Sequence, residues 1–201
     1  MKVFIAGASG RVGTKLTHNL IQDGHEVVAG ARNIEKVVKN GHVTPVKFDL
    51  HESVAEMAQA VGKVDAIYFT AGSGAKDLLQ TDAFGAVKLM QAAAQNGITR
   101  FIMLSALFSL EPNKWRTVKG LDGLTDYNIA KFFADNYLTY TALDYTILQP
   151  TVMTDKSGTG KITVDDVAKT LSEILKYQNT KRKIIKMREG STPIDEALSQ
   201  I

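Results

Sequence analysis

The feature that most constrains the fold is a glycine-rich segment directly after the first apolar run of the chain. Residues Lys2–Ala6 have the composition of a short buried strand, and Arg11–Gln22 have the spacing of an amphipathic helix. Between them lie Gly7, Gly10 and Gly13 in the spacing G-x-x-G-x-x-G. A strand, a glycine turn and a helix in this order are typical of a β-α unit in a parallel sheet.

The rest of the chain continues this alternation of short apolar runs and amphipathic stretches. Further strands are expected at 27–31, 43–48, 65–70, 100–104, 145–148 and 183–187, and further helices at 34–39, 52–61, 81–95, 125–141, 164–177 and 193–199. The pattern predicts an α/β fold with a doubly wound parallel sheet, the three-layer αβα Rossmann architecture. We expect six or seven strands, ordered 3-2-1-4-5-6, with a ligand crevice outside the carboxyl ends of the first and fourth strands.

Length and composition favour one folded domain. The chain has 201 residues, of which 44% are hydrophobic and 22% charged, close to the globular average. We expect a single domain over 1–201, with a core at 1–150 and a short elaboration at 151–201 on the substrate side. The segment 155–160 is interpreted as a loop inside this domain rather than a linker, and 107–123 as a long loop.

Several classes of protein are disfavoured by the composition. No cysteine is present, which excludes disulfides, thiolate chemistry and cysteine-based zinc sites, and the four histidines lack metal-ligand spacing, so no metal is expected. The net charge of +3 is mild, and the basic run at 181–188 fits a solvated strand face better than a phosphate-binding surface, so no nucleic acid is expected. No run approaches about 18 apolar residues. These features predict a cytoplasmic protein, a monomer or homodimer, without membrane contact.

The glycine segment predicts a phosphate-binding loop. Small residues let the turn close tightly and let the backbone approach a pyrophosphate, while the N-terminus of the following helix attracts the phosphates. An ordinary strand-helix turn is the structural alternative, and the position after the first strand favours nucleotide binding. The residues predicted to contact a cofactor here are Gly7, Ser9, Gly10, Arg11, Val12 and Gly13.

The end of the second strand favours NADP(H) over NAD(H). A carboxylate that would bind ribose hydroxyls is missing, and Arg32 follows Ala31 instead. The guanidinium of Arg32 could pair with a 2′-phosphate, with Arg11 assisting, or Arg32 could be a surface residue near a helix start. Further along the chain, Asp49 and Leu50 are placed at the adenine and Ala71 and Gly72 at the nicotinamide half of the cofactor.

A candidate catalytic set lies in the second half of the chain. Tyr127 and Lys131 are four residues apart near a predicted helix start, so their side chains share one helix face. A phenol titrates near pH 10, and a neighbouring ammonium favours its ionised form and lets it exchange protons nearer neutrality. Ser105, at the end of the fifth strand, could hydrogen-bond a carbonyl. A half-buried structural role for Tyr127 is the alternative.

Together these motifs resemble the short-chain dehydrogenases/reductases, in their atypical, sugar-epimerase-like or NmrA-like branch. The resemblance is carried by Gly7, Gly10, Gly13, Ser105, Tyr127 and Lys131, and by the segments 82–86, 143–150 and 162–168. It implies that Ser105 orients the carbonyl, that Tyr127 exchanges the proton, and that Lys131 holds the cofactor ribose and tunes Tyr127. Pro150, which closes the second segment, is also predicted to contact the cofactor.

Two departures from the family pattern bear on activity. Asp82 stands where the family has an active-site Asn, and an ionised Asp accepts hydrogen bonds without donating and could instead pair with Lys131. The C-terminal region is also much shorter than in sugar-modifying members, which leaves only 107–123 and 150–161 to build a substrate pocket.

The leading hypothesis is an NADP(H)-binding oxidoreductase or epimerase-like enzyme acting on a small carbonyl or hydroxyl substrate. The alternatives are a non-catalytic NADP(H)-sensing regulatory protein and a flavin reductase-like protein. The intact set of Ser105, Tyr127 and Lys131 favours an enzyme, whereas Asp82 and the short C-terminal region favour a sensor.

Overall fold

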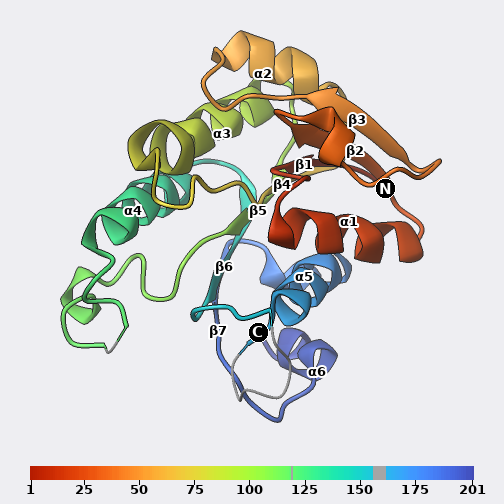
Figure 1. Ribbon diagram of the computed structural model, residues 1–201. Coiled ribbons are helices and arrows are strands. Elements are labelled where there is room, and N and C mark those ends of the chain that lie inside the picture. Colours follow the sequence, from red (N-terminus) through yellow and green to blue (C-terminus); the bar gives the residue numbers. More distant parts are fainter. Residues whose placement is uncertain (119, 156–161) are drawn as a thin grey trace.

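The computed structural model describes residues 1–118, 120–155 and 162–201, and its centre is one seven-stranded parallel sheet (Figure 1). The strand order is β3-β2-β1-β4-β5-β6-β7. The strands are β1 (Lys2–Ala6), β2 (Glu26–Ala31), β3 (Val43–Lys47), β4 (Ala66–Phe69), β5 (Arg100–Leu104), β6 (Asp144–Pro150) and β7 (Lys183–Met187). The predicted Rossmann α/β fold and strand order are therefore confirmed, with β7 extending the edge beyond β6.

Helices cover both faces of the sheet. One layer contains α1 (Arg11–Gln22), α5 (Val164–Glu173) and α6 (Ile194–Ser199), and the other contains α2 (Val54–Val61), α3 (Gly85–Gln95) and α4 (Thr125–Thr139). Alternate residues of β1 pack into the two layers, Val3 and Ile5 against α1 and α5 and Phe4 and Ala6 against α2 and α3. Central strands buried on both faces are the reason why their sequences are almost continuously apolar.

The boundaries of several expected helices differ from the sequence-based expectation. The segment 34–39 forms only a 3₁₀ turn, Ile34–Lys36, capped by the side chain of Asn33, because so short a segment cannot offset the cost of helix nucleation. The helix expected from 52 begins at Val54, after a capping box between Ser53 and Glu56. The helix expected over 164–177 is α-helical only to Glu173 and continues as a 3₁₀ turn.

The largest difference lies before α3. A continuous α-helix was expected over 81–95, but the chain forms a π-helix at Leu78–Phe84 and becomes α-helical at Gly85. Asp82, which is 1% exposed, lies inside the π-helix. A π-helix adds a residue to each turn, so side chains within it face different directions from those in an α-helix of the same sequence.

Two peripheral segments complete the fold. The long loop 107–123 contains a 3₁₀ turn at Pro112–Lys114, and Trp115 packs edge-on against Phe132 of α4. The expected loop at 155–160 lies outside the described residues except for Asp155. No helix in the described ranges is long and apolar enough to cross a membrane.

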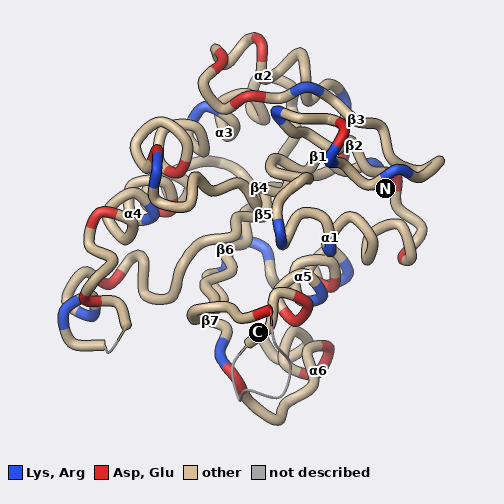
Figure 2. The backbone as a smooth tube through the Cα atoms, in the orientation of Figure 1, with Lys and Arg blue, Asp and Glu red and all other residues tan. Residues whose placement is uncertain are grey.

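Charge is distributed over both layers rather than gathered on one face. Figure 2 shows Lys and Arg interspersed with Asp and Glu along most of the chain. Within the basic run near β7, Lys181 lies 3.2 Å from Asp144 and Lys186 pairs with Glu111. These cations therefore have acidic partners on the protein itself.

Candidate active site

A cavity of about 470 Å³ lies at the carboxyl ends of the central strands. This is the crevice in which open α/β sheets bind their ligands. Most of the site residues predicted from the sequence line it: Gly7, Ser9, Gly10, Arg11, Val12, Arg32, Asp49, Leu50, Ala71, Gly72, Asp82, Ser105, Tyr127 and Lys131. Segments far apart in the sequence therefore converge on one space.

The glycine loop forms one end of this cavity and requires glycine at two positions. Gly7 has a φ of 88°, and a Cβ atom on it would lie 2.7 Å from the backbone of Ala71. A Cβ on Gly13 would lie 2.2 Å from the carbonyl oxygen of Gly7. Gly13 does not itself line the cavity; it lets α1 pack against the loop. The N-terminus of α1 therefore approaches the cavity closely enough for a phosphate to meet its backbone N–H groups.

Pro150 is the other predicted contact that does not line the cavity. It is buried at the end of β6, opposite Met187 of β7, and its carbonyl oxygen accepts a hydrogen bond from the N–H of Leu107 at 3.0 Å. In the described structure Pro150 fixes the start of the long loop at 107–123. No described residue of that loop lines the cavity, so the part of the loop that the structure describes does not form the substrate wall expected from the sequence.

Two arginines lie at the cofactor end, in different surroundings. Arg32 is exposed at the end of β2 and lines the cavity. The guanidinium of Arg11 forms two contacts with Asp155, from Nε at 3.1 Å and from Nη2 at 2.7 Å. Both partners of this pair are exposed, so its free energy is small. Both arginines are exposed at this end of the cavity, and the charge of Arg32 also acts on Asp49.

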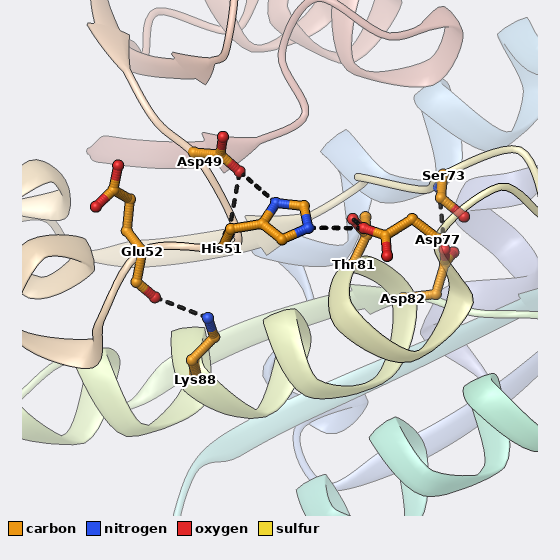
Figure 3. A network of polar contacts seen from close by, with 8 residues as sticks. All are labelled: Asp49, His51, Glu52, Ser73, Asp77, Thr81, Asp82 and Lys88. Atoms are coloured by element: carbon orange, nitrogen blue, oxygen red, sulfur yellow. Dashed lines mark hydrogen bonds and ion pairs between the residues drawn. The ribbon is translucent and has the colours of Figure 1, made fainter.

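An imidazole bridges two carboxylates at the rim of this end (Figure 3). His51 Nδ1 lies 2.9 Å from Asp49 Oδ1, and His51 Nε2 lies 2.9 Å from Asp77 Oδ2. Hydrogen bonding to Asp49, followed by the charges of Asp49 and Asp77, raises the pKa of His51. Partial burial acts to raise the pKa of Asp49, but hydrogen bonds from His51 and the charges of His51 and Arg32 outweigh it and lower that pKa. The bridge joins the segment after β3 to the start of the π-helix.

The predicted catalytic residues lie at the opposite end. Lys131 is 3% exposed, and its Nζ lies 3.7 Å from Asp82 Oδ1 and 5.7 Å from the centre of the Tyr127 ring. The expected proximity of Asp82 and Lys131 is therefore confirmed. Asp82 also accepts a hydrogen bond from the N–H of Ser73 at 3.0 Å, as Figure 3 shows. Desolvation lowers the pKa of Lys131, but the charges of Tyr127, Asp82 and Asp135 outweigh it and raise that pKa.

Sequence reasoning missed a buried polar group behind Ser105. The Ser105 hydroxyl donates to Asp135 Oδ2 at 2.5 Å, and Ser109 and Gln149 also contact that oxygen. A signal for Asp135 was present in the sequence, since it follows Lys131 by four residues and Tyr127 by eight, so all three share one helix face. Ser109 and Gln149 come from other elements, and no spacing connects them to Ser105.

The NAD(P)H-binding protein family matches residues 7–178 of the chain, a range that holds the glycine loop and the whole cavity lining. The chain belongs to this family, as an atypical short-chain dehydrogenase/reductase. Family membership makes it an NAD(P)-binding protein of the oxidoreductase or epimerase type.

Named relatives of this reductase family cover the chain from end to end. An uncharacterized sugar epimerase of Bacillus subtilis, YhfK, is 37% identical over 220 residues, which span all of both chains. The solved structure of the oxidoreductase ylbE from Lactococcus lactis is 44% identical, with a TM-score of 0.95 over 100% of this chain and 96% of that one. A candidate NAD-dependent epimerase/dehydratase from Bacillus halodurans is 32% identical, with a TM-score of 0.87 over 100% of both chains.

Proposed function

We propose that the protein is an NADP(H)-dependent oxidoreductase, or a related epimerase, that acts on a small carbonyl or hydroxyl compound. The observation that carries this proposal is the set of residues that line one cavity. Its lining includes the phosphate loop with the N-terminus of α1 at one end and Ser105, Tyr127 and Lys131 at the other. A dinucleotide held by the loop would therefore extend toward the three groups that handle a carbonyl.

The cavity lining fits a dinucleotide for a steric reason. The backbone of Gly7 lies so close to Ala71 that a side chain at Gly7 would collide with it, and both residues line the cavity, so a bound cofactor would meet backbone there rather than a large side chain. Bound NADP(H) would supply or accept a hydride at the substrate carbon. All proton transfer and positioning would then belong to side chains of this protein.

Tyr127 is the proposed proton donor in reduction and acceptor in oxidation. Its ring lies 5.7 Å from Lys131 Nζ and lines the same cavity as Ser105. Asp82, 3.7 Å from the same ammonium, keeps Lys131 charged and in place. Ser105 would hydrogen-bond the substrate oxygen from the end of β5. The proposed role of Asp82 is thus to hold Lys131 in place, instead of the proton relay that an Asn would support at this position.

Preference for NADP(H) is proposed for Arg32. It lines the cavity directly after β2, where the sequence has no carboxylate to bind ribose hydroxyls, although Asp49 after β3 lines the same cavity. A guanidinium at this position can donate two parallel hydrogen bonds to a 2′-phosphate.

A non-catalytic NADP(H) sensor is the second candidate, and one observation favours it. No described residue of the loop 107–123 lines the cavity, so few groups remain to recognise a substrate. The apolar residues of that loop would then serve a protein partner instead.

The test is a screen followed by one substitution. Purified protein is titrated with NADPH and NADH, and carbonyl compounds, quinones and flavins are screened by loss of nicotinamide absorbance. For any substrate found, Tyr127→Phe should abolish turnover while leaving NADPH affinity nearly unchanged, since the phenol exchanges a proton rather than binding the cofactor. Tyr140→Phe is the matched control, because Tyr140 ends the same helix and is 84% exposed.

Two results would contradict the enzyme proposal. Tight NADPH binding without turnover of any compound would favour the sensor. Full activity of the Tyr127→Phe variant would remove Tyr127 from the reaction.

A further inference from the structure

A buried polar cluster lies directly behind Ser105. Its members are Asp135 of α4, Gln149 of β6, and Ser105 and Ser109 from the segment after β5, all between 0% and 4% exposed. The hydroxyls of Ser105 and Ser109 each lie 2.5 Å from Asp135 Oδ2. Of the four, only Ser105 lines the cavity. Asp135 therefore contacts the cavity lining by hydrogen bond through Ser105, and its charge also acts on Lys131.

The hydrogen atoms in this cluster can be assigned from the donors available. Gln149 Nε2 donates to Ser109 Oγ at 2.6 Å, so the Ser109 hydrogen is free to donate to Asp135. Ser105 has one hydrogen, and a carboxylate at 2.5 Å is a stronger acceptor than a neutral carbonyl. While Asp135 is ionised, the Ser105 hydrogen points at Asp135, and Ser105 offers only lone pairs to the cavity.

Protonation of Asp135 reverses the direction of the hydrogen bond between Asp135 and Ser105. A neutral acid donates from Oδ2 to Ser105 Oγ, and the Ser105 hydrogen then has to find another acceptor. The hydrogen bonds would run in one direction, from Gln149 through Ser109 and Asp135 to Ser105 and out into the cavity. The other carboxyl oxygen, Oδ1, has no hydrogen-bond partner among the described residues, so a proton on it would be a buried O–H without an acceptor, whereas a proton on Oδ2 can be donated to Ser105.

We propose that Asp135 is a positioning residue that controls the Ser105 hydroxyl: the neutral acid turns the Ser105 hydrogen toward the substrate oxygen, and the carboxylate withholds it. The inference rests on the proposed function, in which Ser105 contacts that oxygen. No proton leaves Asp135 in the reaction, because the substrate oxygen still exchanges its proton with Tyr127. Reduction and oxidation share one transition state, so both directions need the Ser105 hydrogen in the cavity.

The electrostatic surroundings make both forms of Asp135 accessible near neutral pH. Burial raises the pKa of Asp135 to about 6, against hydrogen bonds from Ser105 and Ser109 and the charge of Lys131, which lower it. Lys131 lies on the same helix and is paired with Asp82 from the π-helix. The strands on either side contribute uncharged groups to the cluster, the hydroxyls of the segment after β5 and the amide of Gln149 on β6.

The first experiment follows the Asp135 carboxyl group itself and needs no substrate. Protein carrying ¹³C-labelled aspartate is titrated by NMR, and the Asp135 signal is assigned by its loss in Asp135→Asn. We expect the wild-type signal to titrate near pH 6. Ser109→Ala and Ser105→Ala each remove a donor to the carboxylate, so each should raise that pKa by roughly one to two units. Ser172→Ala is the control. Ser172 is a buried serine of α5 whose hydroxyl donates to the backbone carbonyl of Lys169, so this variant should leave the Asp135 pKa unchanged.

The second experiment measures the pH dependence of kcat/KM with a substrate from the screen. Wild-type activity should fall about tenfold per pH unit above the Asp135 pKa, to a plateau roughly 100-fold lower, the usual cost of one lost oxyanion donor. Ser109→Ala should move this limb to higher pH without changing its depth. Asp135→Asn places a permanent N–H donor against Ser105 and should remove the limb, but in a Ser105→Ala background Asp135→Asn should have no further effect.

The outcomes separate this inference from the proposed function. If neither serine variant shifts the Asp135 pKa, the coupling between Asp135 and the two hydroxyls is overturned, whether or not the enzyme is active. If the serine variants shift the Asp135 titration and the enzyme is active, but kcat/KM does not follow that titration, only the control of Ser105 by Asp135 is overturned. Absence of turnover with every carbonyl would overturn the proposed function and the catalytic consequence with it, while the titration would still report the hydrogen bonds.

Discussion

Two aspartates, Asp49 in the lining of the cavity and Asp135 behind Ser105, each accept hydrogen bonds from neighbouring groups, yet their pKa values are shifted in opposite directions. Asp49 accepts from the backbone and ring of His51, and its pKa is lowered. Asp135 accepts from two serine hydroxyls, and its pKa is raised to about 6. The difference comes from water and charge: Asp49 is partly solvated beside cations, whereas Asp135 is 0% exposed among neutral donors. Hydrogen bonds alone therefore do not keep a buried carboxyl group ionised.

The comparison predicts that substitutions have large effects at the buried end and small effects at the solvated end. The largest effect should come from Lys131→Met. It leaves the Asp82 carboxylate, which is 1% exposed, without its ammonium partner, and breaking such a buried pair costs about 3–5 kcal/mol. Turnover should fall by roughly 1,000-fold, because the phenol of Tyr127 loses the neighbouring charge. Chemical denaturation and steady-state kinetics measure the two effects.

A double variant separates the two effects of Lys131. Asp82→Asn keeps an oxygen that can accept the hydrogen bond from the N–H of Ser73, so Lys131→Met/Asp82→Asn should recover most of the lost stability. It should recover none of the turnover. Equal stabilities of the wild type and Lys131→Met would show that the 3.7 Å pair contributes nothing, and the comparison of the two ends would then break down.

An intermediate effect is expected at Arg32. Arg32→Ala should weaken NADPH binding by about 2 kcal/mol, or roughly 30-fold, and leave NADH binding unchanged, because only the 2′-phosphate accepts its charge-assisted hydrogen bonds. Isothermal titration with both cofactors measures this directly. Lys36→Ala is the control, an exposed cation of the next turn that does not line the cavity. Equal losses for NADPH and NADH would make Arg32 a general structural residue.

The smallest effect should come from the His51 bridge. The pKa of His51 is raised, so both ion pairs, with Asp49 and with Asp77, are present below pH 6.5. As pH rises through the raised pKa, the neutral imidazole keeps one N–H and can donate to only one of the two carboxylates. The backbone N–H of Thr81, bonded to the carbonyl of Asp77, should then exchange roughly two- to fivefold faster than in the protonated state. Hydrogen exchange in wild type and His51→Gln measures this, since the variant has no such step and corrects for intrinsic exchange.

Salt provides a further check on the bridge. His51 is largely exposed, and added salt should weaken its ion pairs far more than it affects the buried Lys131–Asp82 pair. A pH step in Thr81 exchange that persists unchanged in high salt would contradict a solvated bridge.

Periodicity and glycine spacing predict the fold well because both depend directly on which residues are buried and where backbone segments pack closely. The alternation of apolar runs and amphipathic stretches predicts the parallel sheet, and Gly7 and Gly13 mark the places where backbone segments approach too closely for any side chain. The cavity gathers most of the predicted residues because many of them directly follow a strand whose carboxyl end faces the crevice, while Asp82, Tyr127 and Lys131 reach it from helices.

The features that were not predicted depend on tertiary contacts that no local pattern contains. The π-helix at Leu78–Phe84 spans only seven residues, too few for its wider turn to be recognised from the spacing of apolar residues. Asp135 shares a helix face with Tyr127 and Lys131 in the sequence, but its contacts with Ser109 and Gln149 come from other elements and could not be predicted. The position of Pro150 was assigned by resemblance, and the pairing of β6 with β7 is what holds it in the sheet, outside the cavity.

The π-helix also gives the chain a constraint on length. An α-helix advances about 100° per residue, so deleting one residue from Leu78–Phe84 would let the segment relax into an α-helix and rotate its side chains by roughly that angle relative to α3. The carboxylate of Asp82 would then turn away from Lys131, even though the deletion need not remove any side chain that lines the cavity. Homologues that keep Asp82 are therefore expected to accept changes of residue between Asp77 and Gly85 more readily than changes in the number of residues, and libraries built on this scaffold should vary composition there while holding the spacing fixed.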